Sequence, residues 1–160
     1  MGIGSSQNVQ IMMDKVPDGL SGFYITVWVS DPEIAKIAEA SSPSWNMITK
    51  NSTSSVPSSS VWIRAIDIGR KVEPGAINVS LGNITLNGTK IGTTNLSIQP
   101  HEVDNDNGNA INLAIVQGQI NVLDDNKAPV TNSVSLNNNT PNTSGSILET
   151  IMKALQHLQI

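Results

Sequence analysis

The 160-residue sequence contains no cysteine and few basic residues. The absence of cysteine excludes a disulfide framework and thiolate chemistry. Nine Lys and Arg stand against thirteen Asp and Glu, giving a net charge of −4 without any basic cluster. Nucleic-acid binding, which depends on clustered positive charge, is therefore not expected. Long apolar runs are also missing, and none approaches the roughly 20 residues of a membrane-spanning helix.

Catalytic motifs are equally scarce. The two histidines, His101 and His157, lie in different segments, and neither has the neighbours that a zinc site needs. The sequence has no nucleophile elbow and no phosphate-binding loop. Most acidic residues stand beside Gly, Pro or Asn, where Asp commonly forms turns. We therefore expect no enzyme activity, and we expect His101, which follows Pro100, to be an exposed loop residue.

The segment from Asp104 to Asn109 is rich in side-chain oxygen and has two interpretations. An EF-hand calcium loop needs Gly at its sixth position and Glu at its twelfth. Counted from Asp104, Gly108 is fifth and Ile115 is twelfth. We therefore predict a turn stabilised by Asn and Asp side chains, with Gly108 at positive φ. Calcium binding remains the alternative.

Alternation of apolar and polar residues dominates residues 8–123. Phe23, Ile25 and Val27 share one face of a strand, while Tyr24, Thr26 and Trp28 share the other. Several short strands separated by turn residues predict an all-β sandwich. The residues predicted to be buried are Phe23, Ile25, Val27, Val61, Ile63, Leu96, Ile98, Ile120 and Val122.

Turn-forming residues set the expected boundaries of the strands. Pro17-Asp18-Gly19 predicts a turn, and residues 49–60 predict a loop. At Gly82 the apolar residues change parity, which indicates a β-bulge. Asn87-Gly88 predicts a two-residue hairpin. The last strand of the sandwich is predicted near residues 116–123.

The C-terminal part has a different character. Residues 124–145 are rich in Asn, Ser, Thr and Pro and show no periodicity, which predicts a linker. Ser146 to Glu149 has the form of a capping box, and apolar residues follow at helical spacing. Residues 146–160 therefore predict a short amphipathic helix. Its apolar stripe needs to be covered, either by the sandwich of the same chain or by a neighbouring copy. We expect the second, which is self-association through this helix.

The start of the chain lacks the charged and apolar segments of a signal peptide. The protein is then either cytosolic or an excised part of a longer one. Ser, Thr and Asn dominate the polar positions, while Lys and Glu are sparse. This composition suits a secreted module, so we expect an extracellular or cell-surface location.

Five motifs in order resemble cohesin modules, the β-sandwiches that capture dockerin domains, and particularly the archaeal type. The resemblance covers residues 6–123. It rests on an opening segment, a Pro-Ser-Trp triplet at residues 43–45, a middle strand, Pro74-Gly75 and a closing strand GQINV. The opening segment is VQIMMDKVPDGLSGFYITVWVSDPEIAKI, and the middle strand is VWIRAID. On this resemblance, residues 33–40 are a strand, although their propensities would also allow a short helix.

The resemblance implies a nine-stranded flattened jelly roll and a non-catalytic, scaffoldin-like docking function. In cohesins one sheet face receives the dockerin helices, and its strands correspond here to residues near 23–30, 61–67, 76–86 and 93–99. The outward residues expected to bind the partner are Tyr24, Thr26, Trp28, Trp62, Arg64, Asn78, Ser80, Asn95, Ser97 and Gln99. Calcium is expected in the dockerin and not in this chain, for which no cofactor is expected.

Two other functions remain open. A carbohydrate-binding module uses a similar sandwich with exposed aromatic residues, and a structural cell-surface domain needs no separate partner. Sugar platforms need coplanar rings along a groove, whereas a docking face mixes aromatic and hydrogen-bonding residues. Thr26, Ser80, Ser97 and Gln99, interspersed among the aromatic residues, favour docking.

Overall fold

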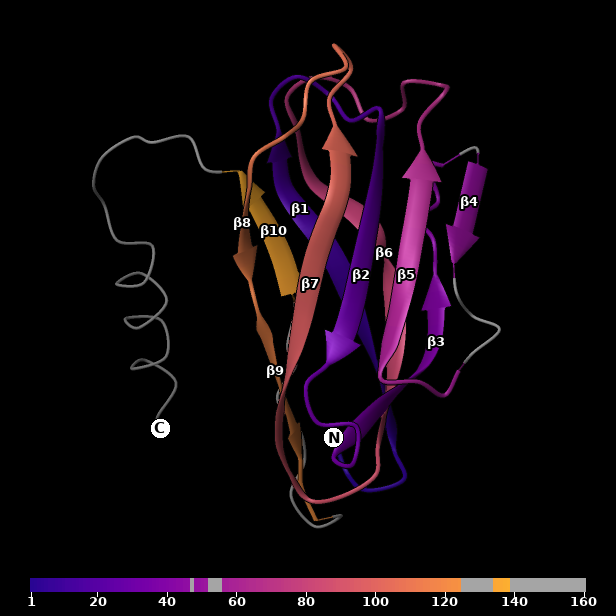
Figure 1. Ribbon diagram of the computed structural model, residues 1–160, viewed down its shortest axis with the longest axis vertical. Coiled ribbons are helices and arrows are strands. Elements are labelled where there is room, and N and C mark those ends of the chain that lie inside the picture. The colour runs from indigo at the N-terminus through magenta and orange to yellow at the C-terminus, as the bar shows by residue number, and fades with distance from the viewer. Residues whose placement is uncertain (47, 52–55, 125–133, 139–160) are drawn as a thin grey trace, which may run out of the picture.

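Ten β-strands form two sheets that pack face to face (Figure 1). The computed structural model describes residues 1–46, 48–51, 56–124 and 134–138. The strands are β1 (Ser6–Val16), β2 (Gly22–Val29), β3 (Ala35–Ser41), β4 (Ile48–Asn51), β5 (Ser60–Ile66), β6 (Ala76–Gly88), β7 (Gly92–Asp104), β8 (Leu113–Val116), β9 (Gly118–Val122) and β10 (Val134–Asn138). No helix in these described ranges is long and apolar enough to cross a membrane.

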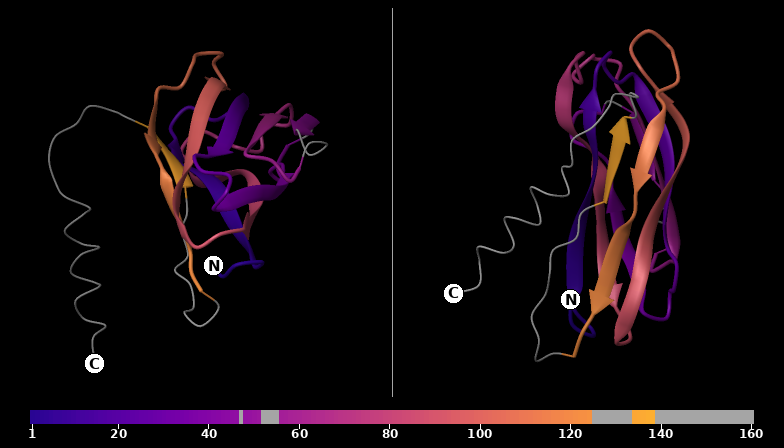
Figure 2. Two further views of the ribbon diagram at one scale, coloured as in Figure 1. Left: turned by 60° about the horizontal axis from the view of Figure 1, so that its bottom comes forward. Right: turned by 90° about the vertical axis from the view of Figure 1, so that its left-hand side faces the viewer.

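Each sheet has five strands. The first, called the β1 sheet, has the order β3-β6-β1-β10-β8, and the second, called the β2 sheet, has the order β4-β5-β2-β7-β9. Figure 1 looks onto the β2 sheet, with β1 and β6 behind it, and the side view in Figure 2 shows the two layers edge on. The predicted all-β sandwich is confirmed, although the described strands number ten and not nine.

The core lies between the sheets and follows the predicted alternation. All nine residues predicted to be buried are at most 5% exposed. Trp45, which follows Pro43, packs against this core. Its indole meets Phe23 edge to face at 6.0 Å, and its Nε1 donates a hydrogen bond to the Ser80 carbonyl at 2.7 Å. Core contacts of this kind fix which face of β2 and β5 points outward, because a shift of one residue would expose every apolar side chain.

The predicted bulge at Gly82 is confirmed. Ile11 of β1 pairs with Gly82, whereas the next residue, Met12, pairs with Ser80, so Leu81 is the additional residue. Gly82 has φ of 138°, and a Cβ there would lie 2.4 Å from the Ser41 carbonyl oxygen of β3. Both the backbone conformation and the close neighbouring strand therefore require glycine. The bulge explains the change of parity along β6.

The turns are only partly as predicted. The turn at residues 17–19 is confirmed, with the Gly19 amide donating to the Val16 carbonyl at 3.3 Å. The hairpin predicted at Asn87-Gly88 is wrong. Both residues lie inside β6, paired with β1 and β3, and the chain then crosses to β7 in the other sheet. Asn-Gly favours a two-residue hairpin between neighbouring strands of one sheet. Because β6 and β7 belong to different sheets, Asn87-Gly88 forms no hairpin here.

Three further segments can be compared with the strands and loops that the sequence predicts. Residues 35–41 form strand β3, so the strand interpretation of this segment is confirmed. The loop predicted for 49–60 is wrong at its start, where β4 pairs with β5. The single strand predicted near 116–123 is two strands, since β8 belongs to the β1 sheet and β9 to the β2 sheet. The chain therefore changes sheets at Gln117.

The largest difference is β10, which lies within the predicted linker 124–145. It runs parallel to β1 and antiparallel to β8, between the two. The sandwich therefore extends to Asn138 and does not end at residue 123. The helix predicted for 146–160 lies outside the described residues, so both the helix and self-association through it stay predictions.

Candidate functional site: the outer face of the β2 sheet

The outer face of the β2 sheet carries most of the predicted partner-binding residues. The inward residues of β2 and β5 are buried, so the alternate residues point to solvent. We define the outer face by Tyr24, Thr26 and Trp28 on β2, Trp62, Arg64 and Ile66 on β5, and Asn95, Ser97, Gln99, His101 and Glu102 on β7. Eight of the ten predicted residues lie on this face, namely Tyr24, Thr26, Trp28, Trp62, Arg64, Asn95, Ser97 and Gln99.

Two predicted site residues lie elsewhere. Asn78 and Ser80 belong to β6, which pairs with β1 and β3 in the β1 sheet. They were predicted from an assignment of residues 76–86 to the same sheet as β2, and that assignment is wrong. The sheet position next to β5 is taken by β4, whose residues the sequence pattern predicts to be part of a loop.

Ser97 is on the outer face but is not accessible, being only 3% exposed. It stands opposite Trp28 in the β2–β7 ladder. Alternation alone therefore overestimates the exposure of Ser97, and its side chain is not accessible to a partner on this face.

The strand register brings the remaining residues into two adjacent rows. Tyr24 lies between Arg64 of β5 and Glu102 of β7. Thr26 lies between Trp62 and Gln99. Directly opposed side chains in antiparallel strands are close enough to interact, so these six residues form one continuous patch.

A second bulge, in β7, adds His101 to the patch. Tyr24 pairs with Glu102 and Ile25 with Pro100, so His101 is the additional residue. Its ring stacks on Tyr24 at 4.5 Å and 27°, and its Nε2 lies 2.9 Å from the Thr26 hydroxyl. The prediction that His101 lies in a loop is wrong, because β7 continues past Pro100 to Asp104. A proline in this position hides the continuation from pattern analysis.

The aromatic rings are arranged at right angles. The Tyr24 and Trp62 centroids are 6.1 Å apart, and the ring planes meet at 88°. Tyr24 is thus held by an edge contact on one side and by the stacked His101 on the other. This arrangement fixes the Tyr24 ring without leaving a flat row of exposed faces.

An ion pair extends across the same row. Arg64 Nη2 and Glu102 Oε2 are 3.8 Å apart, with side chains 53% and 56% exposed. At this exposure the pair contributes little to stability, but both groups are accessible to a partner. Glu102 was missed because the bulge shifts the parity of β7 after Pro100, and no local signal marks that shift.

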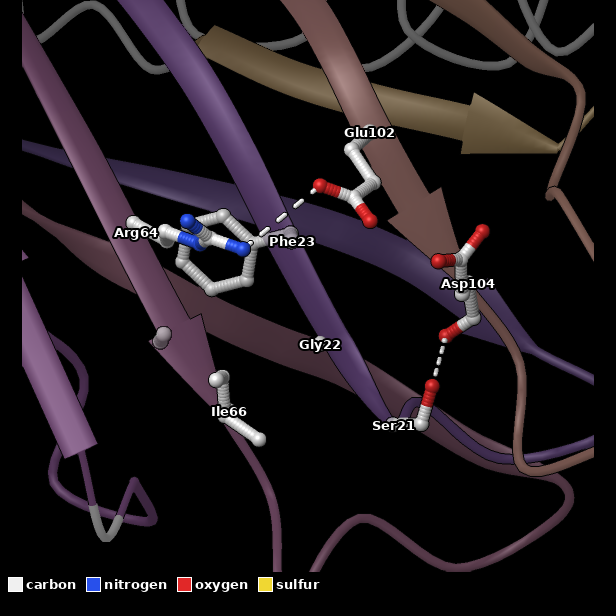
Figure 3. A pocket seen from close by; sticks show the side chains of 8 residues that line it. Ser21, Gly22, Phe23, Arg64, Ile66, Glu102 and Asp104 are labelled. Atoms are coloured by element: carbon white, nitrogen blue, oxygen red, sulfur yellow. Dashed lines mark hydrogen bonds and ion pairs between the residues drawn. The ribbon is translucent and has the colours of Figure 1, made fainter. Parts of the chain in front are cut away.

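Beside this ion pair, the outer face is hollowed at Gly22 (Figure 3). The hollow, here called the Gly22 notch, has a volume of about 230 Å³. It is lined by Ser21, Gly22, Phe23, Arg64, Ala65, Ile66, Glu102 and Asp104. In the ladder Gly22 lies between Ile66 and Asp104, so the absence of a side chain on β2 leaves the space open.

The Asp104–Asn109 loop forms the predicted turn. The Asn105 carboxamide accepts hydrogen bonds from the amides of Asn107 and Asn109, at 3.0 and 2.9 Å. Gly108 has φ of 76°, as expected. Asn105 is buried, so its oxygen is committed to the loop backbone. In the part of the chain that the structure describes, no group of three or more His, Asp or Glu side chains is placed to hold a metal ion.

Comparisons with solved structures find cohesins. The OlpA cohesin of Clostridium thermocellum, solved with the dockerin Doc918, is 12% identical with a TM-score of 0.62, covering 77% of this chain and 92% of that one. The CaCohA2 cohesin of Clostridium acetobutylicum, solved with a variant of the dockerin CaDoc0917, is 16% identical with a TM-score of 0.63, covering 77% and 93%. The seventh ScaB cohesin of Pseudobacteroides cellulosolvens is 14% identical with a TM-score of 0.54, covering 91% of each chain.

No protein-family model matches the chain, and no curated protein matches it. At these identities the structural likeness concerns the arrangement of the strands. The resemblance drawn from the sequence motifs is therefore confirmed at that level: the chain has the fold of cohesin modules.

Proposed function

We propose that this chain is a non-catalytic docking module that binds a dockerin domain through the outer face of the β2 sheet. Two of the similar cohesins were solved in complexes with dockerins. The observation that carries the proposal is the composition of the face. Of the five aromatic residues in the chain, Tyr24, Trp28 and Trp62 lie on it, next to Arg64. Trp, Tyr and Arg are the residues that dominate interface energies.

The ring geometry favours a protein partner over a sugar. A carbohydrate platform needs rings that are coplanar along a groove, but Tyr24 and Trp62 are perpendicular. Hydrogen-bonding groups alternate with the aromatic residues, since Thr26, Gln99 and His101 share the patch. Such a mixed surface suits helices that present both apolar and polar side chains.

The proposal includes an extracellular or cell-surface location and a role in assembling multi-protein complexes. The Ser-, Thr- and Asn-rich composition supports this location. Calcium is assigned to the dockerin and not to this chain, because the oxygen-rich loop at Asp104–Asn109 uses Asn105 for its own backbone.

The test is capture from the proteome of the source organism. The immobilised chain is expected to retain a dockerin-containing protein, identified by mass spectrometry, in calcium but not with a chelator. The Trp62→Ala variant should lose the captured protein, whereas Thr85→Ala, on the opposite sheet, should retain it. If no dockerin is captured, or if the Trp62 variant captures as much as the wild type, the proposal is wrong.

A further inference from the structure

The Gly22 notch has a charge and a shape that select a particular side chain of the partner. Its open side is flanked by the carboxylates of Glu102 and Asp104 and by one guanidinium, that of Arg64. Two negative charges and one positive charge leave a net charge of −1. Figure 3 shows Arg64 and Glu102 facing each other across the strand, with Asp104 farther along β7.

The two carboxylates differ in what they already bind. Glu102 is paired with Arg64 at 3.8 Å. Asp104 accepts hydrogen bonds from the amide and the hydroxyl of Ser21, at 2.9 and 3.0 Å, but it does so through its backbone carbonyl. The Asp104 carboxylate has no ion pair with any residue that the structure describes. Asp104 is only partly buried and lines the notch, so a cation that enters the notch can approach its carboxylate.

Part of the notch lining is apolar. Phe23, Ala65 and Ile66 line it, and Ile66 stands opposite Gly22 on β5. A long aliphatic stem ending in a cation would pack its methylene groups on this surface and reach the carboxylates with its charged end. Lys and Arg have this shape, and a neutral or acidic side chain does not match both parts of the notch.

We propose that the Gly22 notch receives one basic side chain, Lys or Arg, from the docking helix of the partner. The inference rests on the proposed function for the identity of the partner. It deepens that function by separating two tasks on one face. The aromatic patch around Tyr24 supplies contact area, and the notch selects partners with a basic residue at one position.

The notch can be tested without the partner by titrating the whole chain with n-butylguanidinium chloride at constant ionic strength. Amide chemical shifts of a nitrogen-15-labelled sample are the readout. We expect saturable shifts centred on Gly22 and Asp104, and none with the neutral analogue n-butylurea. Glu102→Gln and Asp104→Asn should each weaken this binding by about two- to fivefold, the range of an exposed ion pair. Glu33→Gln, which removes an exposed carboxylate paired with Lys90, is the matched control.

Gly22→Ala is a second variant, which fills the notch without changing its charge. The added Cβ would lie 3.0 Å from the Ala65 carbonyl oxygen, a tight contact, so its thermal unfolding is measured alongside. We expect the folded variant to lose the butylguanidinium shifts. The inference is overturned if butylurea gives the same shifts, if the shifts centre elsewhere, or if the carboxylate variants bind as the wild type does.

The two proposals fail separately. If butylguanidinium binds at the notch but no dockerin is captured, the proposed function is wrong and the notch stands as a site for a basic group. If a dockerin is captured through the aromatic patch but Asp104→Asn changes neither its affinity nor the butylguanidinium shifts, the notch is not the selective element.

Discussion

The two outer faces of the sandwich satisfy their polar groups in different ways. On the β1 sheet, Ser6 donates to the Asn87 carboxamide at 2.7 Å and Thr85 donates to the Asn8 carboxamide at 2.9 Å. These are short side chains paired across strands, and none of the five aromatic residues lies among them. The outer face of the β2 sheet carries three aromatic residues, together with the ion pair between Arg64 and Glu102.

This difference bears on which face suits a partner. The polar side chains of Ser6, Asn87, Thr85 and Asn8 already bind one another, so a partner would gain little by displacing them. The outer face of the β2 sheet carries half-buried aromatic rings and an ion pair whose side chains are 53% and 56% exposed. The proposed function accordingly uses the outer face of the β2 sheet.

The bulges follow the same division. In the β1 sheet the bulge at Gly82 is buried and closed by the Ser41 carbonyl. In the β2 sheet the bulge at His101 turns an additional polar ring onto the surface beside Tyr24. A bulge can serve strand packing or can redirect a side chain to the surface, and both kinds occur in this molecule.

The largest effect is expected from Gly82→Ala, which disrupts the β1 sheet. The new Cβ would lie 2.4 Å from a backbone oxygen in a disfavoured conformation, so we expect the free energy of unfolding to fall by about 2–4 kcal/mol. Gly75→Ala is the control, because Gly75 also has positive φ but has no atom within 4 Å of the added Cβ. It should lose only about 1 kcal/mol in denaturant unfolding. Equal losses would show that the contact with Ser41 is unimportant.

Trp62→Ala should weaken dockerin binding by about 1–3 kcal/mol in calorimetry and leave the domain folded. The indole is half-buried on the outer face and supports Tyr24 by its edge contact. Arg64→Ala is expected to act in the same direction on the same face. Normal binding by both variants would place the docking surface elsewhere.

Thr85→Val removes the hydroxyl that donates to Asn8 on the outer face of the β1 sheet. We expect the free energy of unfolding to fall by about 0.5–1.5 kcal/mol, the net value of one hydrogen bond. Dockerin affinity should be unchanged, since the side chain lies on the other sheet. A loss of affinity without a loss of stability would contradict the division between the two faces.

The smallest effect is expected from the exposed ion pair. A double-mutant cycle with Arg64→Ala and Glu102→Ala should give a coupling energy of about 0.2–1 kcal/mol in thermal or denaturant unfolding. The coupling should decline as salt is added. A coupling energy that is larger and independent of salt would mean that the ion pair contributes to the structure of the outer face and is more than a solvent-exposed contact.

The sequence predicted what depends on local alternation. The faces of β2 and β5 were assigned correctly because each residue's direction follows from its neighbours in the same strand. The bulge at Gly82 and the turn around Asn105 were also local, marked by glycine and by Asn side chains.

The failures concern pairing between distant segments. No residue within β6 indicates that this strand pairs with β1 and β3. The sequence therefore predicts Asn78 and Ser80 on the outer face of the β2 sheet, which is wrong. The position of His101 depends on where β2 pairs with β7, and the strand character of β10 depends on β1 and β8. A short Val-Ser-Leu segment among Asn and Thr residues gives no strong strand signal by itself.

The position of β10 has a practical consequence for anyone who shortens this chain. A version that ended at residue 123, where the cohesin motifs stop, would lack the strand between β1 and β8. β8 pairs only with β10 in the described sheet, and β1 would lose its partner on that side. Two unpaired rows of backbone amides and carbonyls would then be open to strands of other molecules, which is a recognised cause of aggregation. Domain boundaries drawn at Asn138 or beyond keep these rows covered.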